Sequence, residues 1–260
     1  MLLPRVLTAL VGIPLMLWLV HAGGVAYGIF VAAISTLCCY EYAVMLRLGG
    51  RPVQLIPTVV LGGALAACAS LGGPLALVLA AGASAVVLVE MAAKTHSLDR
   101  VALTLFGALF AGWMPAHLAL IRDLRPHGEA FAFLTFVAVW TMDSAAYFAG
   151  RGLGRNALAP VLSPKKTWEG AAAGFAASVV VALIFQKTSL REALTPLQAA
   201  GIGALIGVAG QVSDVAESMV KRDAGVKDSG ALLPGHGGVF DRFDSYILAA
   251  PAVYWALSFK

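Results

Sequence analysis

Charged residues are scarce in this sequence. Asp, Glu, Lys and Arg make up 12% of the 260 residues, whereas a soluble globular domain carries about 25%. Hydrophobic residues account for 60%. This balance excludes an ordinary soluble protein and predicts a polytopic membrane protein. Runs without any of the four charged residue types extend over 6–40, 52–89, 101–121, 170–186 and 193–213.

These runs predict an all-α membrane domain with about nine transmembrane helices. The first two runs are each long enough for two spans, because one span takes roughly 20 residues. Glycine pairs mark the expected turns within them, at Gly23-Gly24 and Gly72-Gly73. Further spans are expected near 130–149 and 244–259. No small-x-small cleavage site ends the first apolar segment, so we interpret it as a span and not as a signal peptide.

Cysteine is also rare, and the chain has only Cys38, Cys39 and Cys68. All three fall inside predicted spans. An odd set within the membrane fits neither a disulfide framework nor a zinc site, so we interpret them as packing residues.

The distribution of Lys and Arg predicts the orientation of the spans. With nine spans and a cytoplasmic N-terminus, 13 of the 18 Lys and Arg residues fall on the cytoplasmic side and 5 on the other. Cytoplasmic loops carry such an excess in membrane proteins. The net charge of +4 then belongs to loops that face anionic lipid headgroups, and no nucleic-acid partner is expected.

Polar residues concentrate in the segment 218–244, which reads SMVKRDAGVKDSGALLPGHGGVFDRFD. Its cations suit phosphate oxygens, its carboxylates suit Mg²⁺, and its glycines allow backbone N–H groups to approach a ligand. These ingredients are typical of metal-assisted phosphoryl transfer. The cations are Lys221, Arg222, Lys227 and Arg242, and the carboxylates include Asp228, Asp241 and Asp244.

Two helix faces in this region are expected to meet. Asp214, Glu217, Ser218 and Lys221 share one face of a helix, because they lie at i, i+3, i+4 and i+7. Asp241, Asp244 and Ser245 repeat this spacing on the next helix. Two facing sets of carboxylates predict a two-cation site.

A second polar segment precedes residue 170. Asp143 enters from the span near 130–149, and the loop from Gly150 to Pro164 is a candidate substrate clamp. Pro164 disfavours helix at the preceding residue, so we expect a helix to begin near Thr167. The free N–H groups at its start would add to phosphate binding by Lys165 and Lys166.

The segment 218–244 resembles the signature of the phosphatidate cytidylyltransferases, also called CDP-diacylglycerol synthases. That signature reads Ser-x-x-Lys-Arg, four residues, Lys-Asp, then Pro-x-His-Gly-Gly-x-x-Asp-Arg-x-Asp. Twelve positions over 27 residues match it: Ser218, Lys221, Arg222, Lys227, Asp228, Pro234, His236, Gly237, Gly238, Asp241, Arg242 and Asp244. The segment 143–170 resembles the upstream Ser-Pro-Lys-Lys-Thr-x-Glu-Gly motif of the family. Residues 1–142 match only in hydropathy and around Tyr40-Glu41-Tyr42.

The resemblance implies an integral-membrane nucleotidyltransferase. It implies transfer of CMP from CTP to phosphatidate, which arrives from the cytoplasmic leaflet of a bacterial inner membrane, with CDP-diacylglycerol and pyrophosphate as products. It also implies Mg²⁺ with a monovalent cation such as K⁺ close by and, from the resemblance alone, a homodimer. The active site is expected at the cytoplasmic ends of the C-terminal helices, with residues 143–260 as the catalytic region and residues 1–142 as scaffold with oligomer contacts.

We predict three groups of site residues on this basis. The predicted metal ligands are Asp214 and Asp241, with Asp143 and Asp244 in support. The predicted substrate-binding residues are Ser163, Lys165, Lys166, Glu169, Ser218, Gly237 and Gly238. The predicted catalytic residues are Lys221, Arg222, Lys227, Asp228, His236 and Arg242.

Other interpretations stay open. A polyprenol or phytol kinase, or an archaeal-type CDP-lipid synthase, would use similar parts. An ion-coupled transporter would need charges near the bilayer midplane and inverted repeats, whereas these charges cluster at one face. At single positions, Asp143 could pair with a neighbouring cation and His236 could be a loop histidine. Glu41 and Glu90 could be structural partners of cations, and the sequence leaves their roles undecided.

Overall fold

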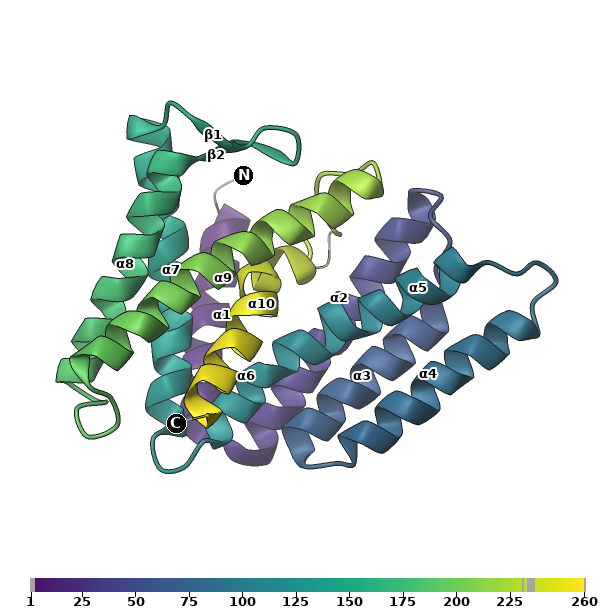
Figure 1. Cartoon of the computed structure of the whole chain (residues 1–260), viewed down its shortest axis with the longest axis horizontal. Coiled ribbons are helices and arrows are strands. Elements are labelled where there is room, and N and C mark those ends of the chain that lie inside the picture. Colours follow the sequence, from purple (N-terminus) through teal and green to yellow (C-terminus); the bar gives the residue numbers. More distant parts are fainter. Residues whose placement is uncertain (1–2, 231, 233–236, 260) are drawn as a thin grey trace. The chain divides into compact units, whose positions relative to one another are not determined.

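The computed structural model describes residues 3–230, 232 and 237–259, and within them the chain is almost entirely helical (Figure 1). Helices α5, η1 and α6 follow one another without a break, and η1 is a π-helical turn. When these three are counted as one continuous helical segment, the described residues form nine such segments, which equals the number of predicted spans. The helices are α1 (Leu3–Ala22), α2 (Gly24–Leu48), α3 (Leu55–Leu71), α4 (Leu75–Met91), α5 (Leu98–Gly107), η1 (Ala108–Trp113), α6 (Met114–Asp123), α7 (Gly128–Leu153), α8 (Trp168–Lys187), α9 (Pro196–Asp223) and α10 (Phe240–Ser258).

Several of these helices have the length and composition of membrane spans. Among the described residues, five meet both criteria: Gly24–Leu48, Leu98–Asp123, Gly128–Leu153, Trp168–Lys187 and Pro196–Asp223. Shorter apolar helices cover Leu10–Ala22, Leu55–Leu71 and Leu75–Met91. This pattern supports a helical multi-pass membrane protein, whereas the count of nine spans and the orientation stay predictions.

Helix boundaries fall where the local sequence predicts them. Gly23 and Gly24 separate α1 from α2 with φ of 62° and 54°, and Gly72 ends α3 with φ of 78°, all in the region that favours glycine. The hydroxyl of Thr167 accepts a hydrogen bond from the N–H of Gly170 at 3.2 Å and caps α8. Both glycine turns and the helix start near Thr167 are therefore confirmed.

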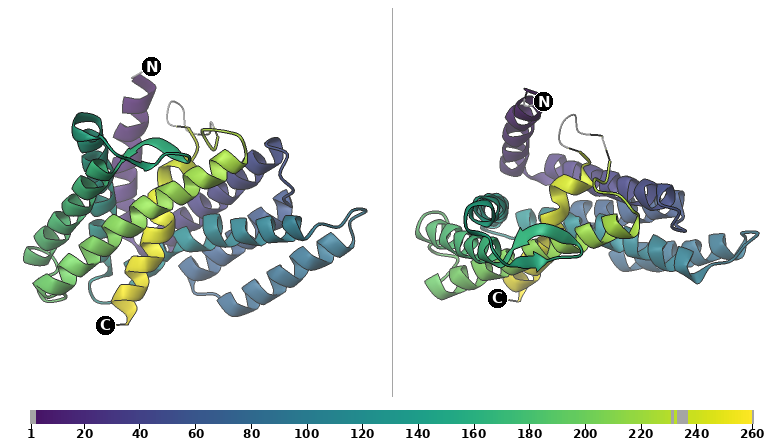
Figure 2. Two further views of the ribbon diagram at one scale, coloured as in Figure 1. Left: turned by 45° about the horizontal axis from the view of Figure 1, so that its top comes forward. Right: turned by 90° about the horizontal axis from the view of Figure 1, so that it is seen from above.

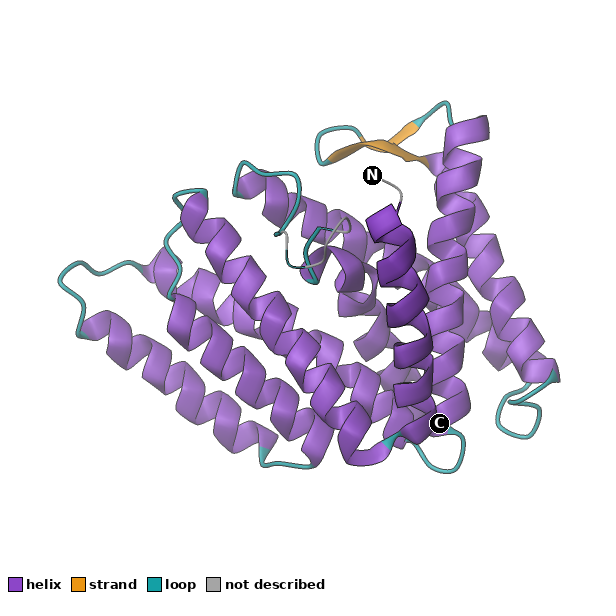
Figure 3. Cartoon of the chain, turned by 180° about the vertical axis from the view of Figure 1, so that it is seen from behind, coloured by secondary structure: helices purple, strands orange, loops and turns teal. Residues whose placement is uncertain are grey.

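The segment expected to be a loop from Gly150 to Pro164 has more regular structure than predicted. Helix α7 continues to Leu153, and β1 (Ala157–Ala159) then pairs with β2 (Ser163–Thr167) in an antiparallel hairpin (Figure 3). The chain is therefore nearly all-α, and the expected loop contains this one short hairpin among the described residues. Pro164 keeps Ser163 out of the helical conformation, and the extended residues that result are able to pair with β1.

The chain divides into two compact units. The first comprises Met1–Leu120 and Val220–Phe243, and the second comprises Ile121–Met219 and Asp244–Lys260. In the first unit α3 lies between α2 and α4 (Figure 1). A Cβ on Gly112 of η1 would lie 2.6 Å from the Cα of Gly62, so this close packing of η1 on α3 requires glycine.

In the second unit α7 and α8 lie side by side, with the β1–β2 hairpin at their joined ends (Figures 1 and 2). Small residues again set the spacing. A Cβ on Gly170 would lie 2.6 Å from the carbonyl oxygen of Ala146, and one on Gly174 would lie 2.9 Å from that of Met142. The hairpin is therefore carried on two closely packed helices.

Candidate active site

A pocket of about 650 Å³ opens in the second unit. The C-terminal half of α7, the hairpin, the start of α8 and helix α9 line it. Its polar lining residues are Asp143, Tyr147, Arg151, Lys165, Lys166, Thr167, Gln211 and Asp214. The fold thus gathers four of the residues predicted from sequence, namely Asp143, Lys165, Lys166 and Asp214. Arg151 and Gln211 were not predicted as site residues.

Several contacts hold the charged groups of this pocket in place. Lys166 forms an ion pair with Asp214. The hydroxyl of Ser245 lies 3.4 Å from Oδ1 of Asp143. The side-chain amide of Gln211 donates to the carbonyl oxygen of Ala171 at 3.1 Å, which ties α9 to the start of α8. The pocket therefore presents cations and carboxylates side by side.

Glu169 has its hydrogen-bond partners within the segment that leads into the hairpin. Its carboxylate accepts from the N–H of Arg155 at 3.1 Å, the N–H of Asn156 at 3.3 Å and Nδ2 of Asn156 at 2.7 Å. These bonds tie residues 155–156 to the first turn of α8, so they help to set where β2 presents Lys165 and Lys166. Direct binding of substrate by Glu169 stays a prediction. Ser163 begins β2 and pairs with Ala159.

Three carboxylates form a cluster in the same unit. Asp214 and Glu217 on α9 and Asp244 on α10 each contribute one oxygen to a set that lies within 4.8 Å of one another. Glu217 is fully buried. The hydroxyl of Ser213 contacts the carbonyl oxygen of Asp244 and accepts from the N–H of Leu248 at 3.0 Å, so α9 and α10 are tied together beside the cluster.

The chemistry of this cluster suits a divalent cation. Carboxylate oxygens are the ligands that Mg²⁺ and Ca²⁺ prefer. Three negative charges this close repel one another, and a cation between them offsets that repulsion. The sequence placed Glu217 on the face of Asp214 but did not assign it as a ligand, although its i, i+3 spacing was the available signal.

Asp241 lies in the first unit, where it contacts three described residues of the signature segment. Its carboxylate accepts from Nζ of Lys221 at 2.9 Å, from the N–H of Gly238 at 2.9 Å and from the N–H of Ser229 at 3.0 Å. Burial alone would raise the pKa of this carboxyl, but the hydrogen bonds, that of Lys221 foremost, hold the pKa below its ordinary value. The assignment of Asp241 as a metal ligand stays a prediction.

The other signature residues have varied surroundings. Lys227, Asp228 and Arg242 are exposed, whereas Ser218 is buried. The guanidinium of Arg222 donates to the carbonyl oxygen of Val226 at 2.8 Å and closes the turn after α9. Gly237 has φ of 84°, which requires glycine. Pro234 and His236 lie outside the described residues, and the predicted role of His236 stays open.

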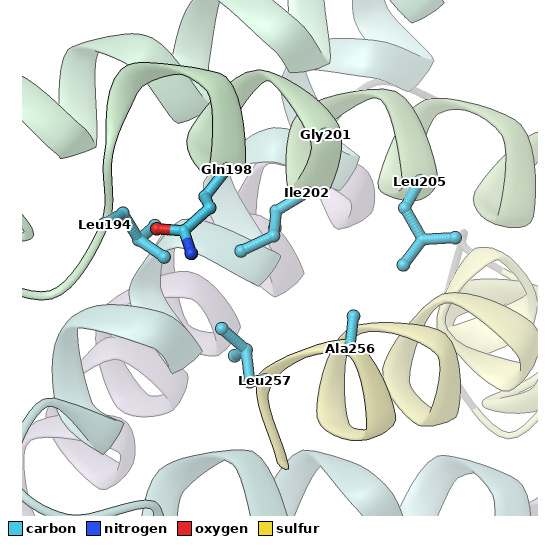
Figure 4. Close-up of a pocket in the computed structure, with 7 residues that line it drawn as sticks. All are labelled: Leu194, Gln198, Gly201, Ile202, Leu205, Ala256 and Leu257. Carbon is cyan, nitrogen blue, oxygen red and sulfur yellow. The ribbon is translucent and has the colours of Figure 1, made fainter. Parts of the chain in front are cut away.

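A second pocket in the second unit, of about 210 Å³, lies between α9 and α10 (Figure 4). None of its seven lining residues is charged, and Gln198 is the single polar side chain among them. These residues are Leu194, Gln198, Gly201, Ile202, Leu205, Ala256 and Leu257. The larger pocket is therefore the better candidate for a charged substrate.

The apolar helices define a helical membrane protein, and its cation-lined pocket and carboxylate cluster offer side chains whose chemistry suits phosphate groups and a divalent cation. A family model described as the cytidylyltransferase family matches residues 3–260, and the chain belongs to this family. It is a nucleotidyltransferase, and the resemblance inferred from the signature is confirmed.

Relatives named phosphatidate cytidylyltransferase cover most of the chain. The one from Brucella suis biovar 1 (strain 1330) is 35% identical over 258 residues, which span 96% of this chain and 91% of the relative. That from Synechocystis sp. (strain ATCC 27184 / PCC 6803 / Kazusa) is 32% identical over 279 residues, with coverage of 96% and 94%. That from Bacillus subtilis (strain 168) is 38% identical over 165 residues, with coverage of 64% and 61%.

Proposed function

We propose that this enzyme transfers CMP from CTP to phosphatidate, giving CDP-diacylglycerol and pyrophosphate. The observation that carries the proposal is the position of Asp214. This residue lines the pocket that contains Arg151, Lys165 and Lys166, and it also belongs to the carboxylate cluster. Phosphate-binding cations and a candidate metal site are thus adjacent. The names of the relatives support the choice of substrates.

The proposed reaction is a single in-line displacement. An oxygen of the phosphatidate phosphate attacks the α-phosphorus of CTP, and the bond from that phosphorus to the leaving pyrophosphate breaks. The lipid phosphate is itself the nucleophile, so no covalent intermediate on the protein is needed. Two polyanions must approach each other while charge builds on pyrophosphate, and cationic side chains with correct orientation therefore supply catalysis.

Lys165, Lys166 and Arg151 bind phosphate oxygens in this proposal. Lys166 is ion-paired with Asp214 in the structure, and a triphosphate offers Lys166 equivalent negative charge. When Lys166 turns to the substrate, the carboxylate of Asp214 becomes available to a cation. Phosphate binding by the signature cations, with Lys221 and Lys227 foremost, is a proposal that rests on the family resemblance.

Asp214, Glu217 and Asp244 would hold Mg²⁺, and Asp143 adds a carboxylate in the adjoining pocket. Bound Mg²⁺ would neutralise charge on the phosphates and on the leaving pyrophosphate. A K⁺ ion beside it, and Asp241 as a ligand, are proposals that rest on the family resemblance.

We also propose the membrane arrangement inferred from Lys and Arg counting. It has nine spans with a cytoplasmic N-terminus in a bacterial inner membrane, so that CTP and phosphatidate reach the site from the cytoplasmic side. Residues 1–142 act as scaffold with oligomer contacts in a homodimer, and residues 143–260 supply most of the catalytic groups.

The decisive assay supplies purified protein in lipid-containing micelles with radiolabelled CTP and phosphatidate. We expect labelled CDP-diacylglycerol that disappears in EDTA and returns with Mg²⁺. Asp214→Asn should nearly abolish the product, whereas Asp123→Asn, an exposed carboxylate at the end of α6, should leave it unchanged. Transfer of phosphate from ATP to a polyprenol would favour the lipid kinase. Transfer of CMP from CTP to another lipid phosphate, with no transfer to phosphatidate, would favour the other CDP-lipid synthase.

A further inference from the structure

Glu41 on α2 is a buried carboxylate that lies far in sequence from the signature segment 218–244. Its side chain is 3% exposed, among residues that are mostly apolar. Burying a carboxylate costs free energy unless hydrogen bonds or a cation compensate for it. Within the described part of the chain Glu41 forms no ion pair, in contrast to Glu90, which pairs with Arg100 at 3.0 Å. Among the described residues, hydrogen bonds to Oε2 compensate part of this cost, whereas Oε1 has no hydrogen-bond partner there.

The hydrogen bonds that the described residues make to Oε2 come from the signature segment. Oε2 of Glu41 accepts from the N–H of Phe240 at 2.8 Å, and the hydroxyl of Ser229 lies 3.2 Å from the same oxygen. Phe240 begins α10, so its N–H has no partner within the helix, and a carboxylate there complements the helix dipole. The ring of Phe240 packs edge-on against Tyr42 and Phe110. Both backbone and side chain thus hold the start of α10.

Ser229 extends the contact to the charged groups of the segment. Its hydroxyl lies 3.0 Å from Oδ2 of Asp241, and its N–H donates to that oxygen at 3.0 Å. Asp241 in turn accepts from Nζ of Lys221 at 2.9 Å. Contacts therefore run continuously from Glu41 through Ser229 and Asp241 to Lys221.

Two glycines of the segment fit closely around Glu41. A Cβ on Gly230 would lie 2.8 Å from Oε1 of Glu41, and a Cβ on Gly238 would clash with Oε2 and with the hydroxyl of Ser229. Only glycine allows the backbone to approach the carboxylate this closely. The backbone at Gly230 and Gly238 is thus matched to the side chain of Glu41.

We infer that Glu41 is a positioning residue for nucleotidyl transfer. It holds Ser229, Gly230 and residues 238–241 in the conformation that presents Lys221 and Asp241, and it does not itself contact the substrates. This inference rests on the proposed role of Lys221 as a phosphate-binding residue. What the site requires is a hydrogen-bond acceptor at the position of Oε2, so the amide of glutamine should substitute for the carboxylate.

The test compares Glu41→Ala, Glu41→Gln and Lys221→Ala with Glu90→Ala as the matched control. Glu90 is also buried in the first unit, and its partners Gln54, Ser97 and Arg100 all lie outside the signature. The readouts are kcat, KM for CTP and the thermal unfolding midpoint. Glu41→Ala should lower kcat about 10- to 100-fold, because a misplacement of about 1 Å can cost about 100-fold. Glu41→Gln should restore kcat to within about threefold of wild type.

Glu90→Ala should lower the unfolding midpoint and leave kcat unchanged. The double variant of Glu41→Ala with Lys221→Ala should be no slower than Lys221→Ala alone, because the two residues act through one chain of contacts. Wild-type kcat and KM in Glu41→Ala, together with an inactive Lys221→Ala, would overturn the positioning role and leave the proposed function intact. Full turnover in Lys221→Ala would instead remove the proposed phosphate site, and the inference with it.

Should Glu41→Ala fail to fold, Ser229→Ala decides the matter, because it removes only the hydroxyl that links the two carboxylates. A kcat at least about fivefold below wild type with a normal unfolding midpoint supports the inference. A wild-type kcat in Ser229→Ala overturns it.

Discussion

Replacing Glu217 by Gln tests the carboxylate cluster by stability as well as by activity. The change keeps the size of the side chain and removes one of three negative charges that lie within 4.8 Å of one another. At an effective dielectric constant near 20, two unit charges at 4.8 Å repel by about 3.5 kcal/mol. Glu217 takes part in two of the three pairs, so the gross relief is about 7 kcal/mol.

The net relief is much smaller, because Lys166 already pairs with Asp214 and the side chains relax. A net gain of 1–2 kcal/mol would raise the unfolding midpoint of a chain of this size by about 2–8 °C. We therefore expect Glu217→Gln to be more heat-stable than wild type in EDTA. In Mg²⁺ the difference in unfolding midpoint should become smaller or change sign, because a cation held by three carboxylates stabilises the wild type more than the variant.

The assay is thermal unfolding of purified protein in EDTA and in Mg²⁺, combined with CMP transfer from CTP. Turnover of Glu217→Gln should fall at least about 100-fold, as expected when a group that supports charge in the transition state is lost. Asp123→Asn, which removes an exposed carboxylate of the same unit, should change neither readout. Three results together would refute the metal-cluster model. They are a lower unfolding midpoint of Glu217→Gln than of wild type in EDTA, an equal increase of the midpoint in Mg²⁺, and normal turnover.

Three further predictions follow from the charged groups and from the topology. Lys227→Ala should lower turnover at least 100-fold while the unfolding midpoint stays unchanged, because the loss of one donor to a transition-state oxyanion costs roughly 2.7–4 kcal/mol; near-normal turnover would remove Lys227 from the site. A C-terminal alkaline phosphatase fusion should be active, since nine spans place the C-terminus outside the cytoplasm, and activity of a cytoplasm-only reporter there would show that the span count is wrong by one. The lowered pKa of Asp241 stabilises the folded state above the unfolded carboxyl pKa of about 3.9 and ceases to do so as pH falls through the folded pKa. The assay compares the unfolding midpoints of wild type and Asp241→Asn at pH 3–7. The midpoint of wild type should be higher by a constant difference from pH 7 to pH 5, and this difference should disappear below about pH 4. A difference that shrinks already between pH 7 and pH 5 would contradict the prediction.

Local sequence determined the class of fold and most helix boundaries. Each apolar run predicts a helix without reference to the rest of the chain, because a helix satisfies its own backbone hydrogen bonds within the membrane. The turns at Gly23-Gly24 and Gly72-Gly73 and the cap at Thr167 depend on residues only a few positions apart. The signature spacing was equally local, and it was sufficient to identify the family.

Tertiary packing decided which of the charged residues meet. Residues 157–159 and 163–167 form a hairpin because extended segments on both sides of a turn pair with each other, which helix-based patterns do not predict. Asp244 joins Asp214 and Glu217 because α10 packs on α9. The residue spacing predicted that carboxylates on two helices would face each other. The rotation of each helix about its axis determines which of their oxygens come close together.

The contact between Glu41 and Ser229 joins residues 188 positions apart, and it shows most clearly what local sequence does not predict. A single buried carboxylate in an apolar helix indicates that some partner exists, since burial without one is costly. Nothing in the residues around Glu41 specifies that the partner is the N-terminus of α10 and the hydroxyl of Ser229. That choice follows only from how the helices of the first unit pack, which brings α2 and the signature segment together.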